Sequence, residues 1–265
     1  MTTTMTDTRS TTGEDDPKPA LYVRQLRKTF GDFVAINDVD LTVPRGQIRA
    51  VIGPNGAGKT TLINVLSGQL VADGGVVEVG GRRLHRQYPH QVAKFGVGRT
   101  YQISSTFRRM SVFDNMLCAH NAVSGNWLSL NPARLREMHE AVMQDLAMIR
   151  LDGIADQVVD NISHGDRKRL EFGMVLATKP TIMLLDEPTA GMAIQERHEL
   201  IDLMLAEARK RNLSLVFVEH DIDVVFKAAE YISVMALGRV LAEGTPDEIA
   251  KNTEVQDVYL GSGHA

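Results

Sequence analysis

The feature that most constrains this chain is a glycine-rich stretch of small and polar residues in its first quarter. Its residues are Gly53, Pro54, Asn55, Gly56, Ala57, Gly58, Lys59, Thr60 and Thr61. They fit the phosphate-binding pattern Gly-x-x-x-x-Gly-Lys-Thr at every fixed position. Gly56 and Gly58 permit the tight turn that points backbone N–H groups at a polyphosphate. Lys59 supplies a charge for the β- and γ-phosphates, and Thr60 a hydroxyl for Mg²⁺.

The residues on either side of this stretch support a phosphate site. The apolar run 48–52 predicts a strand, and residues 61–66 predict the first turns of a helix. The N-terminus of a helix favours anions, so a strand, a glycine loop and a helix in this order suit a bound phosphate. The alternative is a chance glycine-rich turn, which would not need to match four fixed positions in the correct context.

Length and composition limit the function classes. A chain of 265 residues with 43% hydrophobic and 23% charged residues forms one large domain, or one domain with a subdomain. Its net charge of -4 gives no basic excess for a nucleic-acid partner. The single cysteine, Cys118, cannot form an internal disulfide and fits a reducing compartment. Without a run of about 20 apolar residues or an apolar signal core, we expect a cytosolic protein that docks on a membrane component.

The first half of the chain changes character along its length. Residues 1–19 are rich in Thr, Asp and Pro and predict a disordered tail. A β-rich block follows, with strands expected at 21–26, 36–43 and 76–79. Apolar residues then recur at helical spacing over residues 103–160, and a break at 125–132 predicts at least two helices.

The second half alternates helices with apolar runs. Two of the runs are continuous rather than alternating, which is typical of strands buried on both faces of a parallel sheet. The expected helices are 166–177, 194–211 and 246–250, and the expected strands are 181–185, 213–218 and 231–236. The pattern predicts an α/β fold with a helical subdomain inserted into it.

Acidic residues and a histidine follow two of these buried runs. Asp186 and Glu187 end the first run, and His220 ends the second. In open parallel sheets ligands bind outside the carboxyl ends of the strands, so these side chains should meet the phosphate loop. Asp186 would hold Mg²⁺, Glu187 would polarise an attacking water, and His220 would donate to the γ-phosphate. The alternative is a helix-capping acid pair and a structural histidine.

Two further motifs are weaker when taken alone. Gln102 lies where the β-rich block meets the helical region, and its amide can contact both Mg²⁺ and a water. By itself it would be an ordinary polar loop residue. Ser163, His164, Gly165 and Asp166 precede a helix, where Ser163 can cap and Gly165 leaves a backbone N–H open to an anion. Nothing in this spacing requires a phosphate bound by the same chain.

Taken together and in this order, these motifs resemble the ATP-binding cassette (ABC) ATPase family over about residues 21–261. The resemblance implies a P-loop NTPase with a RecA-like mixed sheet core, an antiparallel β subdomain and an inserted α-helical subdomain. It implies ATP and Mg²⁺ as ligands, with Thr60, Gln102 and Asp186 around the metal. It also implies that Phe30, in the frame from Phe30 to Ala35, stacks on adenine. We expect one ABC ATPase domain, residues 20–261, with core segments 20–102 and 165–261, helical subdomain 103–164 and a short tail 262–265.

The family resemblance further implies a mechanism between two subunits. Two cassettes would pair head to tail, as a homodimer or with a paralogue. Ser163, His164, Gly165 and Asp166 of one subunit would then close over the γ-phosphate held by the other. Hydrolysis would reopen the dimer and couple chemistry to motion.

Departures from the usual family motifs indicate a subfamily. His164 and Asp166 replace a Gly and a Gln of the usual Leu-Ser-Gly-Gly-Gln, and Thr189 to Met192 replaces a common Ser-Ala-Leu-Asp. Both changes resemble the cassettes that power import of branched-chain or hydrophobic amino acids and of urea. The resemblance implies two transmembrane permease subunits, an extracytoplasmic solute-binding protein and a place on the inner face of the cell membrane. The alternatives are the ATPase of a lipid or lipopolysaccharide exporter and a soluble ABC ATPase unconnected with transport.

Overall fold

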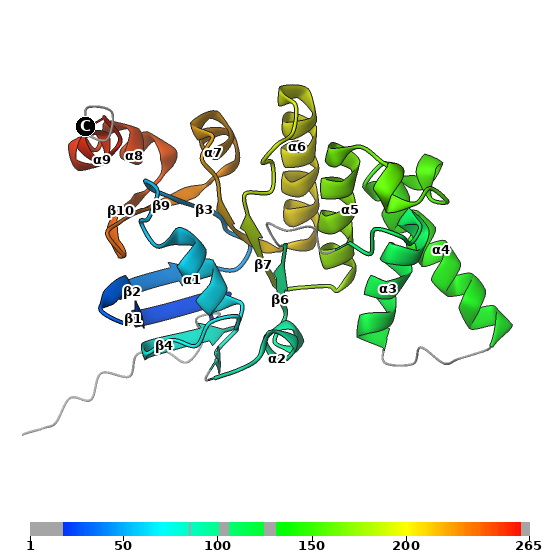
Figure 1. Ribbon diagram of the computed structural model, residues 1–265, viewed down its shortest axis with the longest axis horizontal. Coiled ribbons are helices and arrows are strands. Elements are labelled where there is room, and N and C mark those ends of the chain that lie inside the picture. Colours follow the sequence, from blue (N-terminus) through cyan, green and yellow to red (C-terminus); the bar gives the residue numbers. More distant parts are fainter. Residues whose placement is uncertain (1–17, 85, 101–105, 125–130, 261–265) are drawn as a thin grey trace, which may run out of the picture.

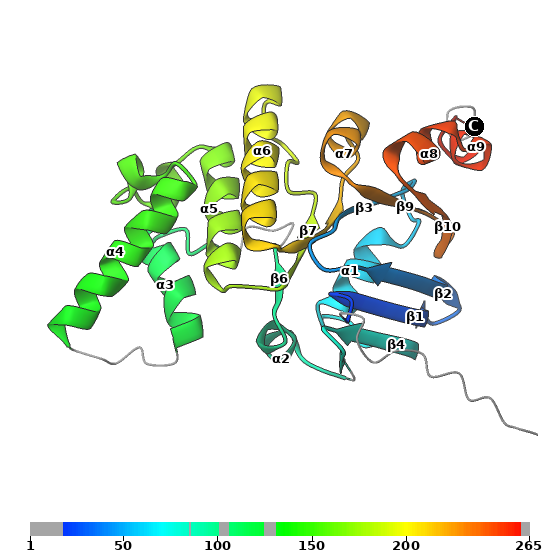
Figure 2. The ribbon, with the colours of Figure 1, turned by 180° about the vertical axis from the view of Figure 1, so that it is seen from behind.

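The chain packs two sheets and several helices into layers. The computed structural model describes residues 18–84, 86–100, 106–124 and 131–260. Helices α5 (His164–Ala177), α6 (Ile194–Arg211) and α7 (Ile222–Ala228) lie along one side of the larger sheet. On its other side lie α1 (Lys59–Leu66) and the smaller sheet (Figures 1 and 2).

The larger sheet carries the predicted buried strands. Its order is β10-β9-β3-β8-β7-β6, and all neighbours run parallel except β9 and β10. The parallel arrangement predicted from continuous apolar runs is therefore confirmed, and the fold is a mixed α/β fold. The strands are β3 (Ile48–Ile52), β6 (Val97–Arg99), β7 (Ile182–Asp186), β8 (Ser214–Val218), β9 (Tyr231–Ala236) and β10 (Arg239–Gly244).

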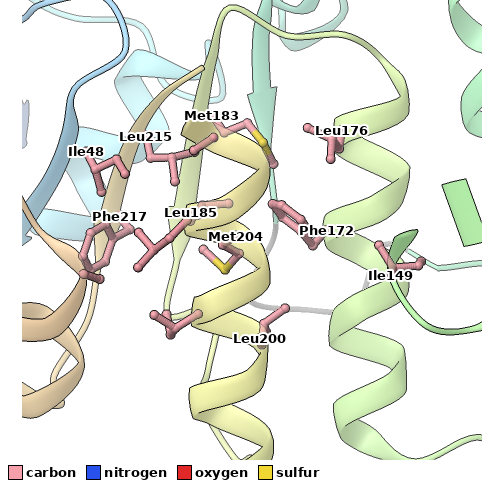
Figure 3. Packing of buried hydrophobic residues seen from close by; sticks show 14 of the residues in the cluster. Ile48, Ile149, Phe172, Leu176, Met183, Leu185, Leu200, Met204, Leu215 and Phe217 are labelled. Atoms are coloured by element: carbon pink, nitrogen blue, oxygen red, sulfur yellow. The ribbon is translucent and has the colours of Figure 1, made fainter. Parts of the chain in front are cut away.

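Each central strand serves two hydrophobic cores, because successive side chains point to opposite faces of a sheet. In β7, Met183 and Leu185 join the core beneath α5 and α6, whereas Ile182 and Leu184 join the core on the side of α1 and the smaller sheet. Figure 3 shows Met183, Leu185 and Phe217 facing side chains of the two helices. Burial on both faces explains why these strands read as unbroken apolar runs.

The smaller sheet is antiparallel and has the order β2-β1-β4-β5. Its strands are β1 (Leu21–Phe30), β2 (Phe33–Val43), β4 (Gly74–Val79) and β5 (Arg82–Arg83). The sequence predicted that the first strand would stop near residue 26. β1 instead continues to Phe30 through an irregular step, where Gln25 adopts a φ of 49° and its N–H donates to Asp40 Oδ1 at 2.6 Å. The Asp40 carboxylate thus accepts the Gln25 N–H at the point where the register between β1 and β2 shifts.

The two helical pieces expected within residues 103–160 are confirmed. They are α3 (Val112–Ser124) and α4 (Pro132–Met148), and α3 packs against both α4 and α5. The buried amide of Asn115 fixes the turn before α3, since its Oδ1 accepts from Phe107 N at 2.7 Å and its Nδ2 donates to Phe107 O at 3.1 Å.

Several short elements were not predicted. They are α2 (Pro89–Lys94), the strands β5, β6 and β10, the 3-10 turns η1 (Asp152–Ile154) and η2 (Val159–Asn161), and α9 (Thr253–Leu260), which follows the expected helix α8 (Pro246–Lys251). The strand β6 and the turns η1 and η2, of three residues each, contain too few residues to display a period. The predicted tails, residues 1–19 and 262–265, fall outside the described residues apart from Lys18 and Pro19. Among the described residues, no helix combines the length and apolar character needed to cross a bilayer.

The core beneath α6 should dominate stability. Phe217 is buried at the centre of this core, so Phe217→Ala should lower the free energy of unfolding by about 3–5 kcal/mol through lost burial and a cavity. The control is Phe226→Ala on α7, where the residue is 37% exposed and the loss should be smaller, about 1–2 kcal/mol. Urea unfolding measures both, and equal losses for the two variants would contradict this view of the core.

Candidate functional site

The glycine-rich loop joins the end of β3 to the start of α1, as predicted. Gly53, Gly56 and Gly58 adopt φ values of 149°, 79° and 100°, a region that other residues rarely occupy. At Gly58 an added Cβ would lie 2.5 Å from Ala35 O, and at Gly53 it would lie 2.1 Å from Met235 O. Glycine at these two positions is therefore required by close approach as well as by backbone conformation.

Lys59 closes this loop from the inside. Its Nζ donates to Gly53 O at 2.7 Å and to Pro54 O at 3.0 Å. Burial lowers the pKa of the Lys59 ammonium, while the nearby Glu187 and Asp186 carboxylates act to raise it. Two backbone carbonyls thus hold the Lys59 ammonium at the loop. A bound anion can take their place as its hydrogen-bond acceptor.

A cavity of about 250 Å³ lies over the loop. It is lined by residues from β2, from the loop and the start of α1, and from the ends of β7 and β8. They are Phe33, Ala35, Asn55, Gly56, Ala57, Gly58, Lys59, Thr60, Thr61, Glu187 and His220. The structure therefore brings the predicted loop residues, the predicted acid and the predicted histidine to one concave surface.

Glu187 and His220 contact each other at this cavity. His220 Nε2 lies 2.9 Å from Glu187 Oε1. Glu187 adopts a φ of 50°, an uncommon left-handed conformation for a residue with a side chain, and its N–H donates to Val218 O at 3.0 Å. Such conformations concentrate at functional sites, where neighbouring contacts hold them in place.

Asp186 ends β7, one residue before Glu187, and is almost completely buried. Its Oδ2 is 3.7 Å from Arg99 Nη2, and its Oδ1 has no hydrogen-bond partner among the described residues. Burial raises the pKa of the Asp186 carboxyl, and the Arg99 guanidinium opposes that rise. A buried carboxylate oxygen without a hydrogen-bond partner, at the position before Glu187, fits a hard cation such as Mg²⁺.

The described residues hold no cluster of three or more His, Cys, Asp or Glu side chains that could bind a metal on its own. Mg²⁺ does not require such a cluster, since it keeps several waters and binds substrate phosphates with one or two protein oxygens. The Thr60 hydroxyl at the cavity and the unpartnered Asp186 Oδ1 are oxygens of this kind. Gln102, the other predicted metal residue, lies outside the described residues.

Ser163, His164, Gly165 and Asp166 begin α5 and are not among the described residues that line the cavity. Ser163 is the N-cap, since its Oγ accepts from Asp166 N at 3.0 Å and donates to Asp166 Oδ2 at 2.8 Å. His164 Nε2 lies 3.0 Å from Ala190 O. This turn therefore contacts the segment after Glu187 rather than the glycine loop of its own chain.

Among the described residues that line the cavity the aromatic one is Phe33, and the adenine-stacking role of Phe30 stays a prediction. Phe30 ends β1, 48% exposed, with Lys28 Nζ 5.5 Å from its ring centroid, and it is not among the described lining residues. Phe33 begins β2 directly opposite Phe30 in the hairpin. Phe33 was not among the residues predicted from the sequence, where its one signal is a second phenylalanine directly after Gly31 and Asp32.

Two family models match the sequence. The first, described as ABC transporter, matches residues 36–190. The second, described as branched-chain amino acid ATP-binding cassette transporter, matches residues 239–265.

Known relatives align along nearly the whole chain. A probable branched-chain amino acid transport ATP-binding protein LivG of Archaeoglobus fulgidus is 36% identical, over 91% of this chain and 95% of the relative. The high-affinity branched-chain amino acid transport ATP-binding protein LivG of Escherichia coli is 35% identical, over 92% and 98%.

Solved structures of ATP-binding cassettes also match this fold over nearly the whole chain. A nucleotide-free ATP-binding cassette from an ABC transporter superposes with a TM-score of 0.80 at 28% identity, over 91% of this chain and 98% of that one. An ATP-binding cassette of an ABC transporter in its ADP conformation gives a TM-score of 0.81 at 29% identity, over 92% and 99%.

The buried Asp186 carboxylate should cost the protein stability in the absence of ligands. Because its pKa is raised in the folded state, wild-type stability should increase as pH falls through that pKa. Asp186→Asn should therefore raise Tm at pH 7.5 by about 2–4 °C, the shift expected per 1 kcal/mol for a chain of this size. The gain should shrink as the pH is lowered.

Thermal unfolding of the ligand-free protein across pH measures this effect. Asp156→Asn, at an exposed position, is the control and should leave Tm unchanged. A lower Tm for Asp186→Asn at pH 7.5, or a difference independent of pH, would contradict the stated role of burial.

Proposed function

The chain belongs to the ABC transporter family of ATP-binding cassettes, and from this premise we propose that it is the ATP-hydrolysing subunit that powers solute import through separate transmembrane subunits. The observation that carries the proposal is one cavity lined by the glycine loop, Glu187 and His220. A phosphate cradle, a carboxylate and a histidine at the same edge of a parallel sheet are the groups that phosphoryl transfer to water requires.

We propose the following roles at that cavity. The backbone N–H groups of residues 53–61 and the Lys59 ammonium bind the β- and γ-phosphates. Glu187 accepts a hydrogen bond from the attacking water, and His220 donates to the γ-phosphate and keeps the water in line. Thr60 and Asp186, joined by Gln102, would hold Mg²⁺, which supplies positive charge to the phosphate oxygens when bound.

Nucleotide stacking involves an aromatic residue at the β1–β2 hairpin. The family resemblance assigns this role to Phe30, whereas the cavity lining supports Phe33. The two phenylalanines pair directly across the hairpin, so their side chains lie on the same face of it.

We propose that the active form is a dimer of cassettes, identical or paralogous. Ser163, His164, Gly165 and Asp166 lie away from the cavity of their own chain, which supports a role toward nucleotide on a second subunit. An N-capped helix start with a glycine suits an anion delivered from outside.

A second cavity supports a transmembrane partner. It measures about 380 Å³ and lies among α2, β6, α3 and α5, with Phe107, Ala122 and Met174 in its mainly apolar lining. The groove includes Arg99, which precedes Gln102 by three positions in the sequence. We propose that it receives a cytoplasmic helix of a permease subunit, which holds the cassette on the inner face of the membrane.

We propose a branched-chain or other hydrophobic amino acid as the transported solute. The relatives carry branched-chain amino acid transport in their names, and residues 239–265 match the corresponding family model. The permease subunits and an extracytoplasmic binding protein would recognise the solute. We also propose the domain division made from the sequence, with residues 103–164 as a helical subdomain between core segments 20–102 and 165–261.

Substitutions at the cavity separate binding from hydrolysis. Glu187→Gln should lower ATP hydrolysis by about 10²- to 10⁴-fold, the contribution of a positioned base, while ATP still binds and the closed dimer accumulates. Lys59→Ala should weaken ATP binding by about tenfold or more, because a charge-assisted contact is lost.

Steady-state hydrolysis, equilibrium binding of ATP and size-exclusion chromatography measure these effects. Glu230→Gln, at the opposite end of β3, is the matched control and should behave like the wild type. Turnover by Glu187→Gln at the wild-type rate would show that another group polarises the water.

The partner proposal is tested at the loop before α3. Arg108 is engaged by Asp160 at 2.7 Å, whereas Arg109 is exposed, so Arg109→Glu is the cleaner charge reversal. It should abolish uptake by the assembled transporter and leave ATP hydrolysis by the isolated subunit intact. Arg24→Glu, exposed on β1, is the control. Loss of hydrolysis, or full uptake, by Arg109→Glu would argue against a docking role.

A further inference from the structure

We propose that Glu219 is a positioning residue for ATP hydrolysis, holding the segment after Glu187 so that the Glu187 carboxylate stays aimed at the cavity. This inference rests on the proposed function, in which Glu187 polarises the attacking water. Glu219 itself is not among the described residues that line the cavity, so its effect is transmitted through a neighbour.

The contact that carries the proposal is buried and doubly hydrogen-bonded. Glu219 follows β8 and directly precedes His220, and its side chain accepts two bonds on the same oxygen. Oε1 accepts from Thr189 N at 3.0 Å and from Thr189 Oγ1 at 2.6 Å. Thr189 is 1% exposed and Glu219 is 5% exposed. Charge-assisted bonds in a buried setting are strong and fix geometry.

The position of Thr189 matters because Glu187 lies two residues before it in an uncommon conformation. The φ of 50° at Glu187 is held on one side by its N–H bond to Val218 O and on the other by the Thr189 bonds to Glu219. Pro188 between them has restricted backbone freedom. A strained conformation persists only where neighbouring contacts over-determine it, so releasing Thr189 lets Glu187 relax and turn away from His220.

The same segment is held at further points along its length. Arg197 contacts Asp221, which follows His220, and its Nη2 donates to Met192 O at 3.4 Å. His164 Nε2 meets Ala190 O at 3.0 Å from the start of α5. The residues before and after His220 therefore both anchor residues 188–193, and this segment in turn contacts the turn proposed to act on the second subunit's nucleotide. A displacement at the end of β8 would therefore move both the segment that carries Glu187 and the turn at the start of α5.

The test separates turnover from binding. Glu219→Ala should lower kcat by about 10²-fold, the cost of misplacing a catalytic group by about 1 Å. KM and the affinity for ATP should stay at wild-type values, because Glu219 does not contact the phosphate loop. Glu219→Gln keeps an acceptor oxygen of the same reach, so it should restore most of the loss. A residue that served only to stabilise the fold would not give this split between kcat and KM.

Thr189→Val and Thr189→Ser form a second pair that probes the other side of the contact. Valine removes the hydroxyl donor and should reduce kcat, whereas serine keeps the donor and should not. If Glu219→Ala does not fold, this pair carries the test. Combining Thr189→Val with Glu219→Ala should reduce kcat no further than Glu219→Ala does alone, because both changes break the same contact.

Glu230→Ala is the matched control. Glu230 also accepts a backbone N–H, from Ile48 N at 3.2 Å, but at the end of β3 farthest from the cavity. Wild-type kcat in Glu219→Ala, or a loss in Glu219→Gln equal to that in Glu219→Ala, would overturn the inference while leaving the proposed function intact. Absence of ATP hydrolysis in the wild type would instead overturn the proposed function.

Discussion

Parallel pairing of β3, β8 and β7 is the constraint on which the site depends. Three neighbouring strands that run the same way end at one edge of the sheet, so the residues that follow them must meet there. The glycine loop follows β3, Glu187 follows β7, and His220 comes two residues after β8. No single segment of the chain contains the site, and hydrogen bonding between distant strands assembles it.

The two hydrophobic cores that cover the faces of the larger sheet stabilise this arrangement, and the polar site does not. Alternate residues of each central strand enter different cores, so the strands are held on both faces. The charged residues at the edge of the sheet reduce the stability that the two cores provide. Burial raises the pKa of Asp186 and lowers that of Lys59, and each shift reflects a charge kept partly out of water. The apolar layers therefore hold in place groups that ligands can neutralise.

The segment from Pro188 to Ala193 links the end of β8 to the start of α5. Glu219 and Arg197 hold it from the side of His220, and His164 meets it from the start of α5. His164 replaces a glycine common in the family, and the imidazole supplies a contact that glycine lacks. Two departures from the usual family motifs, His164 and the stretch from Thr189 to Met192, are therefore in contact, because Ala190 and Gly191 lie against the His164 ring.

Local patterns were sufficient to predict the glycine loop, helix Ile194–Arg211, the strand Tyr231–Ala236 and the acids after β7, because each depends on residues adjacent in the chain. The sequence could not predict the short strand β6 or helix α2, which contain too few residues to show a period and form through contacts with β7 and with each other. It also could not reveal that Phe33 rather than Phe30 lines the cavity, or that Glu219 reaches Thr189 thirty positions earlier. Those facts belong to the tertiary structure, because hairpin pairing and strand order decide which side chains face each other across distances that no sequence period spans.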